Sequence, residues 1–487
     1  MKTPRVVLWL AATLVAGAVV MALEMAAVRL FAPYFGYSIY VWATTICVVM
    51  AAMVAGYAIG GRLADTPKAE AHLFIAILSS AAWQLLALWT VRAVLPRLAE
   101  TSEVTGVTLA ALILFAPSMI ALAATGPILV RLCADVATIG RAAGLVYALS
   151  TAGSMAGILA TTFFLLPRLG THATLQMLCG TSFLIGTAGL VLSFNRRALA
   201  LPLAAMFVPL MLSPGLGWAE GSVWTAESPY NLVRVVQSGS QWLLQLNHPS
   251  SIHTVRDSSG IWTGYYYDYF ALGPLMVPGA RRALVLGMGG GGSIRSMRLT
   301  APGIAIDAVE IDPRVVEAAT RWFGVDPADA GLRIHVMDAR RFLSRDRGTY
   351  DLVQLDVYQG GPYIPFHLVT EEFFRLARAR MSDDGLLMMN VFDSGPGRAL
   401  LLRLAATLRR VFPSVMFGQT DAGNFMLFAF VHASLSVPIP GGPQALRANA
   451  GVRDLQLRDV PLPPSTPPFT DDLAPVEALT RRMLASR

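Results

Sequence analysis

An apolar run leads into a glycine-rich turn at residues 283–292, which read ALVLGMGGGG. Glycine allows positive φ and lets the backbone come close to a ligand. In a sheet of parallel strands, the first turn from strand to helix is where a nucleotide lies. The pattern predicts nucleoside binding by Gly287, Gly289 and Gly290, although a glycine turn alone could be only a tight turn.

Acidic residues end the next two predicted strands. Glu310 stands 23 residues after Gly287, where a carboxylate can accept both ribose hydroxyls. Asp338, followed by Ala339, ends a third strand and can accept from the adenine amino group. Three strand ends would then meet at one adenosine. The alternative is that Glu310 and Asp338 only cap the helices that follow them.

Six short segments, taken in order, resemble the spermidine synthase (polyamine aminopropyltransferase) family. They are ESPYN (227–231), YYD (266–268), GMGGGG (287–292), VEIDP (309–313), MDARRFL (337–343) and YDLVQLDV (350–357). The resemblance covers about residues 222–435. The apolar N-terminal half, with LEMAAVRLFAPYFG, and the C-terminal TDDLAPVE make the chain similar to the membrane-bound spermidine-synthase-like proteins of bacteria.

The resemblance implies a transferase that moves an aminopropyl group from decarboxylated S-adenosylmethionine to a di- or polyamine and releases methylthioadenosine, without a metal. Asp356 matches the family's catalytic aspartate and is expected to orient and deprotonate the amine. It could instead cap a turn. Tyr266 and Asp268 match the tyrosine and glutamate that line the family's site, and we expect Tyr266 to assist catalysis. Asn231 stands where the family has glutamine and is expected to contact the donor.

A cationic acceptor would need anionic and aromatic walls. The residues that could provide them are Tyr267, Asp268, Asp356, Tyr358, Tyr363, Asp393, Asp471 and Asp472.

Three departures from the family pattern concern the substrates. Gly290 replaces an aspartate that binds the donor's amino group, Tyr267 replaces a histidine, and the loop DVYQGGPYIPF lacks the family's second aspartate. A pocket without the first carboxylate would repel intact S-adenosylmethionine less. A methyltransferase or lyase that uses S-adenosylmethionine therefore stays an alternative. A polyamine transporter or sensor with a non-catalytic nucleotide domain is another.

The elements that must position these residues begin at residue 222. Short alternating apolar runs predict two or three strands of a small β-subdomain over 222–262. Residues 265–277 are predicted to be helical. Strands and helices then alternate, which predicts an α/β doubly wound, Rossmann-like domain of the class I methyltransferase type over 263–435. A Pro-rich tail follows over 436–487.

The first 214 residues have a different composition. The chain is 54% hydrophobic and only 14% charged, against about 25% in soluble proteins, and the deficit of charge lies almost entirely before residue 215. This predicts an all-α polytopic membrane domain of about seven helices. The apolar segments are 6–30, 39–60, 72–95, 106–125, 142–166, 172–194 and 198–214.

The Lys/Arg bias of the loops predicts a cytoplasmic N-terminus in a bacterial inner membrane. Seven crossings would put the catalytic domain outside the cytoplasm, away from a cytosolic metabolite. We therefore expect that segment 198–214, which holds Pro202 and Pro209, does not cross fully, or that one earlier segment is miscounted. Glu24 and Arg29 are ionisable residues within the first segment, where they either pair structurally or serve a pathway.

Other partners follow from composition and resemblance. The net charge of +7 does not indicate nucleic acid, because no dense Lys/Arg run is present. The three cysteines have no CxxC spacing and predict neither zinc nor a disulfide framework. Expected partners are the lipid bilayer, a small-molecule amine and, by resemblance, a second copy of the chain.

Overall fold

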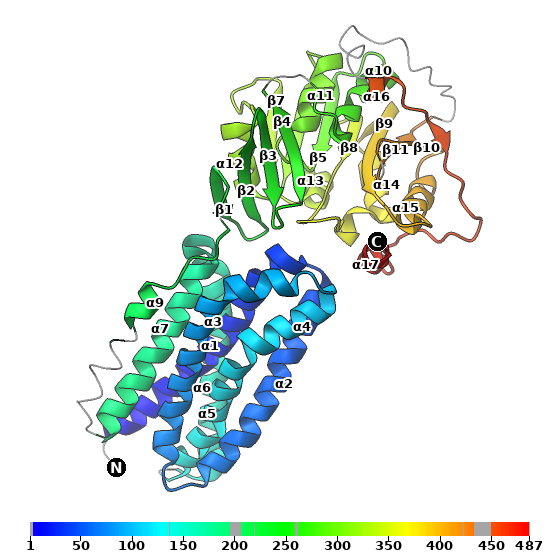
Figure 1. Ribbon diagram of the computed structural model, residues 1–487. Coiled ribbons are helices and arrows are strands. Elements are labelled where there is room, and N and C mark those ends of the chain that lie inside the picture. Colours follow the sequence, from blue (N-terminus) through cyan, green and yellow to red (C-terminus); the bar gives the residue numbers. More distant parts are fainter. Residues whose placement is uncertain are drawn as a thin grey trace. The chain divides into compact units, whose positions relative to one another are not determined.

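The computed structural model describes residues 3–135, 137–194, 205, 207–218, 220–258, 262–421, 423–432 and 450–486 (Figure 1). They fall into two compact units, Met1–Glu220 and Gly221–Arg487. The division agrees with the change in composition near residue 215.

The first unit is helical. Its elements are α1 (Thr3–Phe35), α2 (Ile39–Ala64), α3 (Ala69–Leu98), α4 (Glu103–Leu114), α5 (Ala116–Ala134), α6 (Ile139–Ala160), the π-helix η1 (Thr161–Leu165), α7 (Leu166–Phe194) and α9 (Phe207–Met211). Within the described residues, five helical stretches are long and apolar enough to cross a membrane. The fifth, Ile139–Phe194, contains Gly170, whose φ of 78° and ψ of 174° are not helical, so two helices meet there.

Two predicted spans differ in the structure. Segment 106–125 falls across the end of α4 and the start of α5, and the helix long enough to cross there is Ala116–Ala134. Segment 198–214 has 17 residues, of which 8 lie outside the described residues. Its described part contains only the short helix α9, which ends at Met211. Pro202 and Pro209 fall in this segment, and proline removes a backbone donor that a continuous helix needs.

Glycines allow the long helices to pack closely. A Cβ atom on Gly153 of α6 would lie 2.0 Å from the backbone oxygen of Leu14 in α1, and one on Gly157 would lie 2.2 Å from that of Ala18. Small residues at such contacts let helix backbones approach in a membrane, where burial from water does not drive association. Gly153 and Gly157 therefore let α6 pack directly against the backbone of α1.

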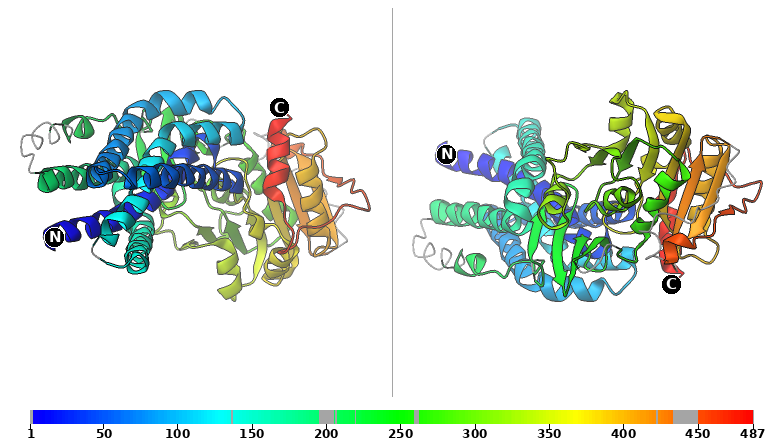
Figure 2. Two further views of the ribbon diagram at one scale, coloured as in Figure 1. Left: turned by 90° about the horizontal axis from the view of Figure 1, so that it is seen from below. Right: turned by 90° about the horizontal axis from the view of Figure 1, so that it is seen from above.

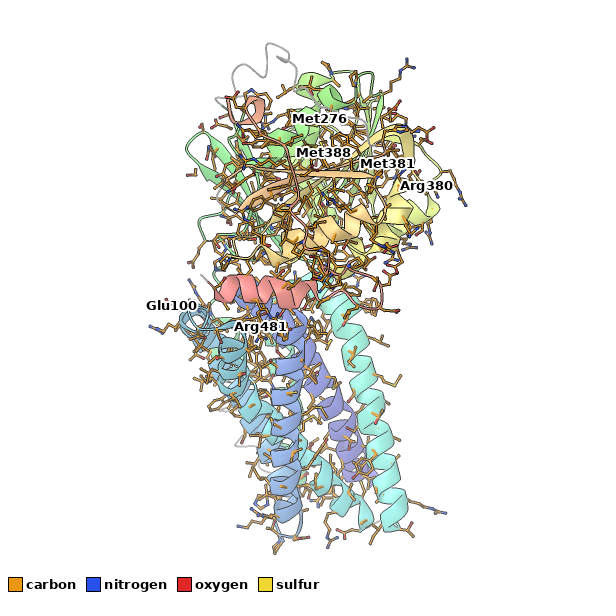
Figure 3. The ribbon with its side chains drawn as sticks, turned by 90° about the vertical axis from the view of Figure 1, so that its right-hand side faces the viewer. Glu100, Met276, Arg380, Met381, Met388 and Arg481 are labelled. Carbon is orange, nitrogen blue, oxygen red and sulfur yellow. The ribbon has the colours of Figure 1, made fainter. Side chains whose placement is uncertain are left out.

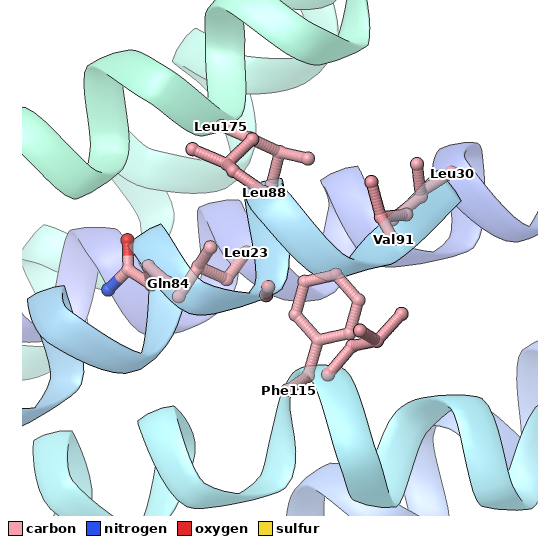
Figure 4. Close-up of a pocket in the computed structure, with 9 residues that line it drawn as sticks. Leu23, Leu30, Gln84, Leu88, Val91, Phe115 and Leu175 are labelled. Atoms are coloured by element: carbon pink, nitrogen blue, oxygen red, sulfur yellow. The ribbon is translucent and has the colours of Figure 1, made fainter. Parts of the chain in front are cut away.

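The interior of this unit holds polar groups. Glu24 and Arg29 are both buried, and Arg29 donates to the hydroxyl of Tyr37. Gln84 donates to Ser80, beside a cavity of about 20 Å³ that is otherwise lined by apolar side chains such as Leu23 and Leu175 (Figure 4). The Ser80 hydroxyl lies 2.7 Å from that of Ser118, so this group of hydrogen bonds joins α3 to α5 and satisfies polar groups that lipid cannot.

The second unit begins with a small antiparallel sheet. Its strands are β1 (Trp224–Glu227), β2 (Leu232–Ser238), β3 (Gln241–Leu246) and β4 (Ile252–Asp257), paired in that order. The sequence predicted two or three strands, and the structure has four. The predicted helix at 265–277 is the 3₁₀ helix η3 (Tyr266–Leu272) followed by the short α10 (Gly273–Met276).

The large sheet has eight strands in the order β12-β10-β11-β9-β8-β5-β6-β7. Their bounds are β5 (Arg282–Leu286), β6 (Ala305–Glu310), β7 (Leu332–Val336), β8 (Tyr350–Leu355), β9 (Met381–Phe392), β10 (Ser414–Gln419), β11 (Asn424–Phe430) and β12 (Arg458–Asp459). Strands β5 to β9 pair in parallel, which confirms the doubly wound prediction. The antiparallel strands β10, β11 and β12 were not predicted.

Helices follow the strands along this unit. They are α11 (Gly292–Thr300), α12 (Pro313–Trp322), α13 (Ala339–Arg345), η4 (Phe366–Leu368), α14 (Glu371–Arg378), α15 (Ala399–Arg409), α16 (Ala450–Arg453) and α17 (Val476–Ala485). The C-terminal helix α17 packs on α15 (Figures 1 and 2). The Pro-rich tail therefore ends in regular structure.

Both faces of the parallel sheet are buried. Along β5, Leu284 and Leu286 belong to one core cluster and Ala283 and Val285 to another. Figure 3 labels three buried methionines of this unit, Met276, Met381 and Met388. A strand covered on both faces is largely apolar, as β5 is, and the polar residues that line the cavity stand at or just after the strand ends. The site residues lie at those ends.

Candidate active site

A cavity of about 220 Å³ opens at the carboxyl ends of β5, β6 and β8 and beyond the end of β7. The carboxyl ends of neighbouring parallel strands meet at one sheet edge, which is why residues far apart in sequence line it. Nine predicted site residues line this cavity: Asn231, Tyr267, Gly287, Gly289, Glu310, Asp338, Ala339, Asp356 and Tyr358. Four others do not: Tyr266, Asp268, Gly290 and Tyr363.

The glycine turn needs its glycines. Gly287 has φ of 83°, and a Cβ atom there would lie 2.1 Å from the backbone oxygen of Asp356. Gly289 has φ of 52° and donates its N–H to Oε2 of Glu310 at 3.0 Å. The turn therefore brings its backbone against two other strand ends without side chains in the way.

Glu310 does not cap the helix that follows it. The N-cap of α12 is Asp312, whose carboxylate accepts from the N–H of Arg314 at 2.9 Å. Glu310 accepts instead from the N–H groups of Gly289 and Asp312. Burial raises the pKa of Glu310 to about 7, although these hydrogen bonds oppose the rise. It lines the cavity at the place expected for a ribose acceptor.

Asp338 does cap a helix, and it also faces the cavity. Its Oδ1 accepts from the N–H of Arg341 at 2.9 Å, at the start of α13. Its Oδ2 lies 3.2 Å from Nε2 of His367, on η4. The hydrogen bond from His367 is the main reason that the pKa of Asp338 lies below its usual range. Asp338 thus stays an anion at neutral pH.

Asp356 is held from two sides. Its Oδ2 accepts from the hydroxyl of Tyr266 at 2.9 Å, and its Oδ1 accepts from Nδ2 of Asn390 at 3.1 Å. Burial raises the pKa of Asp356 to about 6, while the two hydrogen bonds lower it. Burial and the nearby Asp356 raise the pKa of Tyr266 well above 10, so Tyr266 remains a donor.

Two of the tyrosines that line the cavity, Tyr267 and Tyr358, bind backbone groups through their hydroxyls. The Tyr267 hydroxyl accepts from the N–H of Val255 at 2.7 Å. The Tyr358 hydroxyl accepts from the N–H of Phe392 at 2.8 Å and donates to the carbonyl of Asn390. Burial raises the pKa of both tyrosines. What these residues offer a ligand is the aromatic ring, which can face a cation.

Asn231 joins the small sheet to the end of β6. Its Nδ2 donates to Oδ2 of Asp312 at 3.0 Å, and the hydroxyl of Ser228 donates to the same oxygen at 2.6 Å. The side chain of Asn231 also accepts from Asn247. Asn231 lines the cavity, and its hydrogen bonds to Asp312 and Asn247 help to fix the small sheet beside the end of β6.

Several predicted acidic residues have local structural contacts outside the cavity lining. Asp268 accepts from the N–H groups of Thr263 and Gly264, within the turn before η3. Asp393 accepts from the N–H of Leu401, near the start of α15. Asp471 is bound by Arg340. In the described structure these carboxylates accept hydrogen bonds from backbone N–H groups and from an arginine of the same unit.

The turn at Gly290 has no room for a side chain. A Cβ atom there would lie 2.9 Å from Cβ of Thr254, whose hydroxyl accepts from the Gly290 N–H at 2.9 Å. Thr254 and His253 of β4 line the cavity at this place. Burial lowers the pKa of His253 to about 4, so its imidazole is neutral at pH 7. This wall carries no negative charge.

Sequence reasoning missed several residues of the site. They are Tyr230, His253, Thr254, Ser293, His367 and Asn390. Asn390 left a signal, because a single amide in the apolar strand GLLMMNVF suggests a buried partner. Thr254 and His253 left none, since the small sheet had no predicted register.

Comparison with known proteins finds relatives that are similar to the part of the chain that holds this site. Residues 268–421 match the model of the spermine/spermidine synthase domain. A probable polyamine aminopropyl transferase of Bifidobacterium longum is 30% identical over 197 residues, which are 40% of this chain and 43% of that protein. A polyamine aminopropyltransferase of Vibrio vulnificus is 35% identical over 153 residues, 30% of this chain and 50% of that protein. The chain thus spans about half the length of these relatives or less.

Other similar proteins carry different names. The human eEF1A lysine and N-terminal methyltransferase is 28% identical over 169 residues, 32% of this chain and 24% of that protein. A solved probable spermidine synthase from Corynebacterium glutamicum shares 20% identity with a TM-score of 0.41, over 48% of this chain and 90% of that one. Residues 268–421 of the C-terminal unit are thus similar to the spermine/spermidine synthase domain, as the sequence motifs predicted.

Proposed function

We propose that this chain is a membrane-anchored transferase of the spermidine synthase type. It moves an aminopropyl group from decarboxylated S-adenosylmethionine to a di- or polyamine and releases methylthioadenosine. One observation carries the proposal. Gly289, Glu310, Asp338 and Asp356 follow four neighbouring parallel strands and line a single cavity.

The donor's adenosine occupies the glycine-turn end of the cavity. Glu310 accepts from the ribose hydroxyls, and Asp338 accepts from the adenine amino group. Asp338 suits this part because its pKa lies below the usual range, which keeps it an acceptor at neutral pH. Glu310 has a pKa of about 7, and hydroxyl donors from the ribose stabilise its charged form.

The chemical step is a displacement at the methylene carbon next to the sulfonium. The amine nitrogen forms a bond to this carbon, the carbon–sulfur bond breaks, and its electron pair stays on sulfur as neutral methylthioadenosine. Asp356 takes the proton that the nitrogen loses and passes it to water. A pKa of about 6 suits a base that works near neutral pH. Tyr266 and Asn390 hold the carboxylate toward the nitrogen.

The membrane unit anchors the transferase with its active site on the cytoplasmic side. The five apolar stretches, with the last divided at Gly170, make six crossings among the described residues. An even number of crossings returns the chain to the side of its N-terminus, which the Lys/Arg bias assigns to the cytoplasm. Segment 198–214 then does not cross, and the metabolite and the site share one compartment.

A second candidate is a transferase that uses intact S-adenosylmethionine on the same scaffold. The observation that favours it is the wall at Gly290, where Thr254 fills the space of a side chain and His253 is neutral. The donor's carboxylate meets no anion there, so the wall does not select for the decarboxylated form.

The test incubates the purified full-length protein in detergent with each donor, with and without putrescine or spermidine, and identifies products by mass. The proposal expects methylthioadenosine and an aminopropylated amine, formed only with the decarboxylated donor and a diamine. Consumption of S-adenosylmethionine alone would refute it, and adenosylhomocysteine would indicate methyl transfer. Asp356→Asn should abolish product formation. Asp383→Asn makes the same chemical change at an exposed position and should retain it.

A further inference from the structure

The segment 469–473 near the C-terminus is bound to the helices beside the adenine end of the cavity. The N–H of Glu371 in α14 donates to the carbonyl of Phe469 at 2.9 Å. The ring of Phe469 is fully buried, and its N–H donates to the hydroxyl of Thr407 in α15 at 2.9 Å. The N–H of Asp471 donates to Oε2 of Glu372 at 3.0 Å. The segment is therefore fixed in place on both helices.

Asp471 collects donors from two elements. Both terminal nitrogens of Arg340 donate to its two oxygens, one of them at 2.7 Å, and the hydroxyl of Thr370 donates at 2.8 Å. A bidentate pair between arginine and carboxylate is directional and stronger than a single surface contact. The pKa of Asp471 lies below its usual range, with the Arg340 hydrogen bond as the main cause.

Arg340 carries this restraint into the site. Its Nη1 also donates to the backbone carbonyl of His367 at 3.1 Å. Arg340 lies two residues after Asp338 on α13, and the imidazole of His367 lies 3.2 Å from the Asp338 carboxylate. Asp338, His367 and Leu368 all line the cavity. We call the cavity lining formed by Asp338, His367 and Leu368 the adenine wall. The Arg340 guanidinium therefore joins α13 and η4, the two elements that position this wall, and Asp471 binds that guanidinium.

We propose that Asp471 and Arg340 form a clamp that positions the adenine-recognising wall, so that the C-terminal segment sets affinity and selectivity for adenine nucleosides. The inference rests on the proposed function, since it takes Asp338 as the acceptor for the adenine amino group. Asp471 is a positioning residue and not a wall of the amine site. Its charge acts on donor binding, and the displacement step at Asp356 does not depend on it.

The test measures binding of methylthioadenosine and methylthioinosine to the full-length protein in detergent by calorimetry. Asp471→Asn removes the bidentate pair and should weaken methylthioadenosine binding about tenfold, the effect of losing one hydrogen bond to a charged group. Methylthioinosine lacks the exocyclic amino group, so its affinity should change less and the selectivity ratio should fall. In the proposed reaction, KM for the donor rises while kcat at saturation stays within about twofold.

Matched variants distinguish loss of the Asp471–Arg340 clamp from a general loss of stability. Asp383→Asn makes the same change at an exposed residue outside the cavity lining and should bind like the wild type. Arg340→Lys keeps the charge but loses the planar fork, so it should reproduce the effect of Asp471→Asn. It also serves as the test if Asp471→Asn does not fold. The inference is overturned if both clamp variants bind methylthioadenosine with wild-type affinity and selectivity. If the wild type does not bind methylthioadenosine at all, the proposed function fails instead.

Discussion

Replacing Asp356 with asparagine should stabilise the folded protein at alkaline pH while it removes activity. Burial raises the pKa of Asp356 from 3.8 to about 6. The folded state favours the protonated acid, so protonated Asp356 contributes to stability. This contribution is complete below pH 3.8 and is lost as the pH rises through 6. Each unit of difference between the folded and unfolded pKa corresponds to about 1.36 kcal/mol. At pH 8 the charged carboxylate therefore lowers the stability of the folded state by about 3 kcal/mol.

Asparagine can replace the carboxylate without adding a buried unpaired group, since Asn390 has one amide atom without a partner among the described residues before the substitution and one after it. Its side-chain oxygen can accept from the Tyr266 hydroxyl, which now lies 2.9 Å from Oδ2 of Asp356. The new amide nitrogen needs an acceptor, and Oδ1 of Asn390 has no partner among the described residues. Rotation of the Asn390 amide presents that oxygen. The variant therefore removes the charge and keeps both contacts.

The assay is thermal unfolding of the full-length protein in detergent at pH 8 and pH 4.5. At pH 8, Asp356→Asn should melt roughly 6 °C or more above the wild type, and at pH 4.5, which is still above the unfolded pKa of 3.8, the difference should shrink to about a third of that. Turnover should fall by about 10²–10⁴ if Asp356 is the base. Asp383→Asn, at an exposed site, controls for the general effect of the substitution. A variant that melts below the wild type at pH 8, or a difference independent of pH, would refute the argument.

Three further predictions concern the same cavity. Tyr266→Phe removes a hydrogen bond that lowers the pKa of Asp356, so the acidic limb of kcat/KM should move above pH 6, measured as a pH–rate profile. Methylthioadenosine binding should weaken as the pH falls through about 7, where Glu310 gains a proton, and Glu310→Gln should flatten that dependence in calorimetry. Gly287→Ala places a Cβ atom 2.1 Å from the backbone oxygen of Asp356 at φ of 83°, and should lower nucleoside affinity at least about tenfold in the same assay.

The nucleoside side of the cavity was predictable because strand ends fix position. Glu310, Asp338 and Asp356 each stand at or just after the end of an apolar run, and parallel strands bring such ends to one edge. The sequence could not show that Asp338 also caps α13 or that Asp312, rather than Glu310, caps α12. Spacing gives a residue's place along an element but not which donors reach it.

The residues expected to bind the acceptor amine were predicted less well, because an acidic side chain was taken as a sign that the residue lines the cavity. Asp268 lies at the start of η3 and Asp393 just after β9, where each carboxylate accepts from nearby backbone N–H groups. Asp471 meets an arginine 131 residues away in sequence, a contact that no local pattern contains. The roles proposed for these residues depended on tertiary pairing.

One structural miss had a signal in the sequence. The run SVMFGQ, the turn TDAG and the run NFMLFAF (414–430) have the form of a hairpin and became β10 and β11. For this hairpin, composition received more weight than the turn residues. Segment 198–214 had the hydropathy of a span, but its two prolines led us to expect an incomplete crossing, and only the short helix α9 lies in its described part.

Three carboxylates share one cavity, and their surroundings separate their chemistry. Asp338, paired with His367, has a lowered pKa and suits recognition of a donor group. Burial raises the pKa of Glu310 and Asp356 toward neutrality. In the proposed displacement, the positive charge leaves the sulfur and appears on the attacking nitrogen. A carboxylate beside that nitrogen is stabilised as the charge arrives, and a pKa near 6 lets it take the proton afterwards. Asp356, with Tyr266 and Asn390 fixing its two oxygens, is the carboxylate whose environment meets both demands.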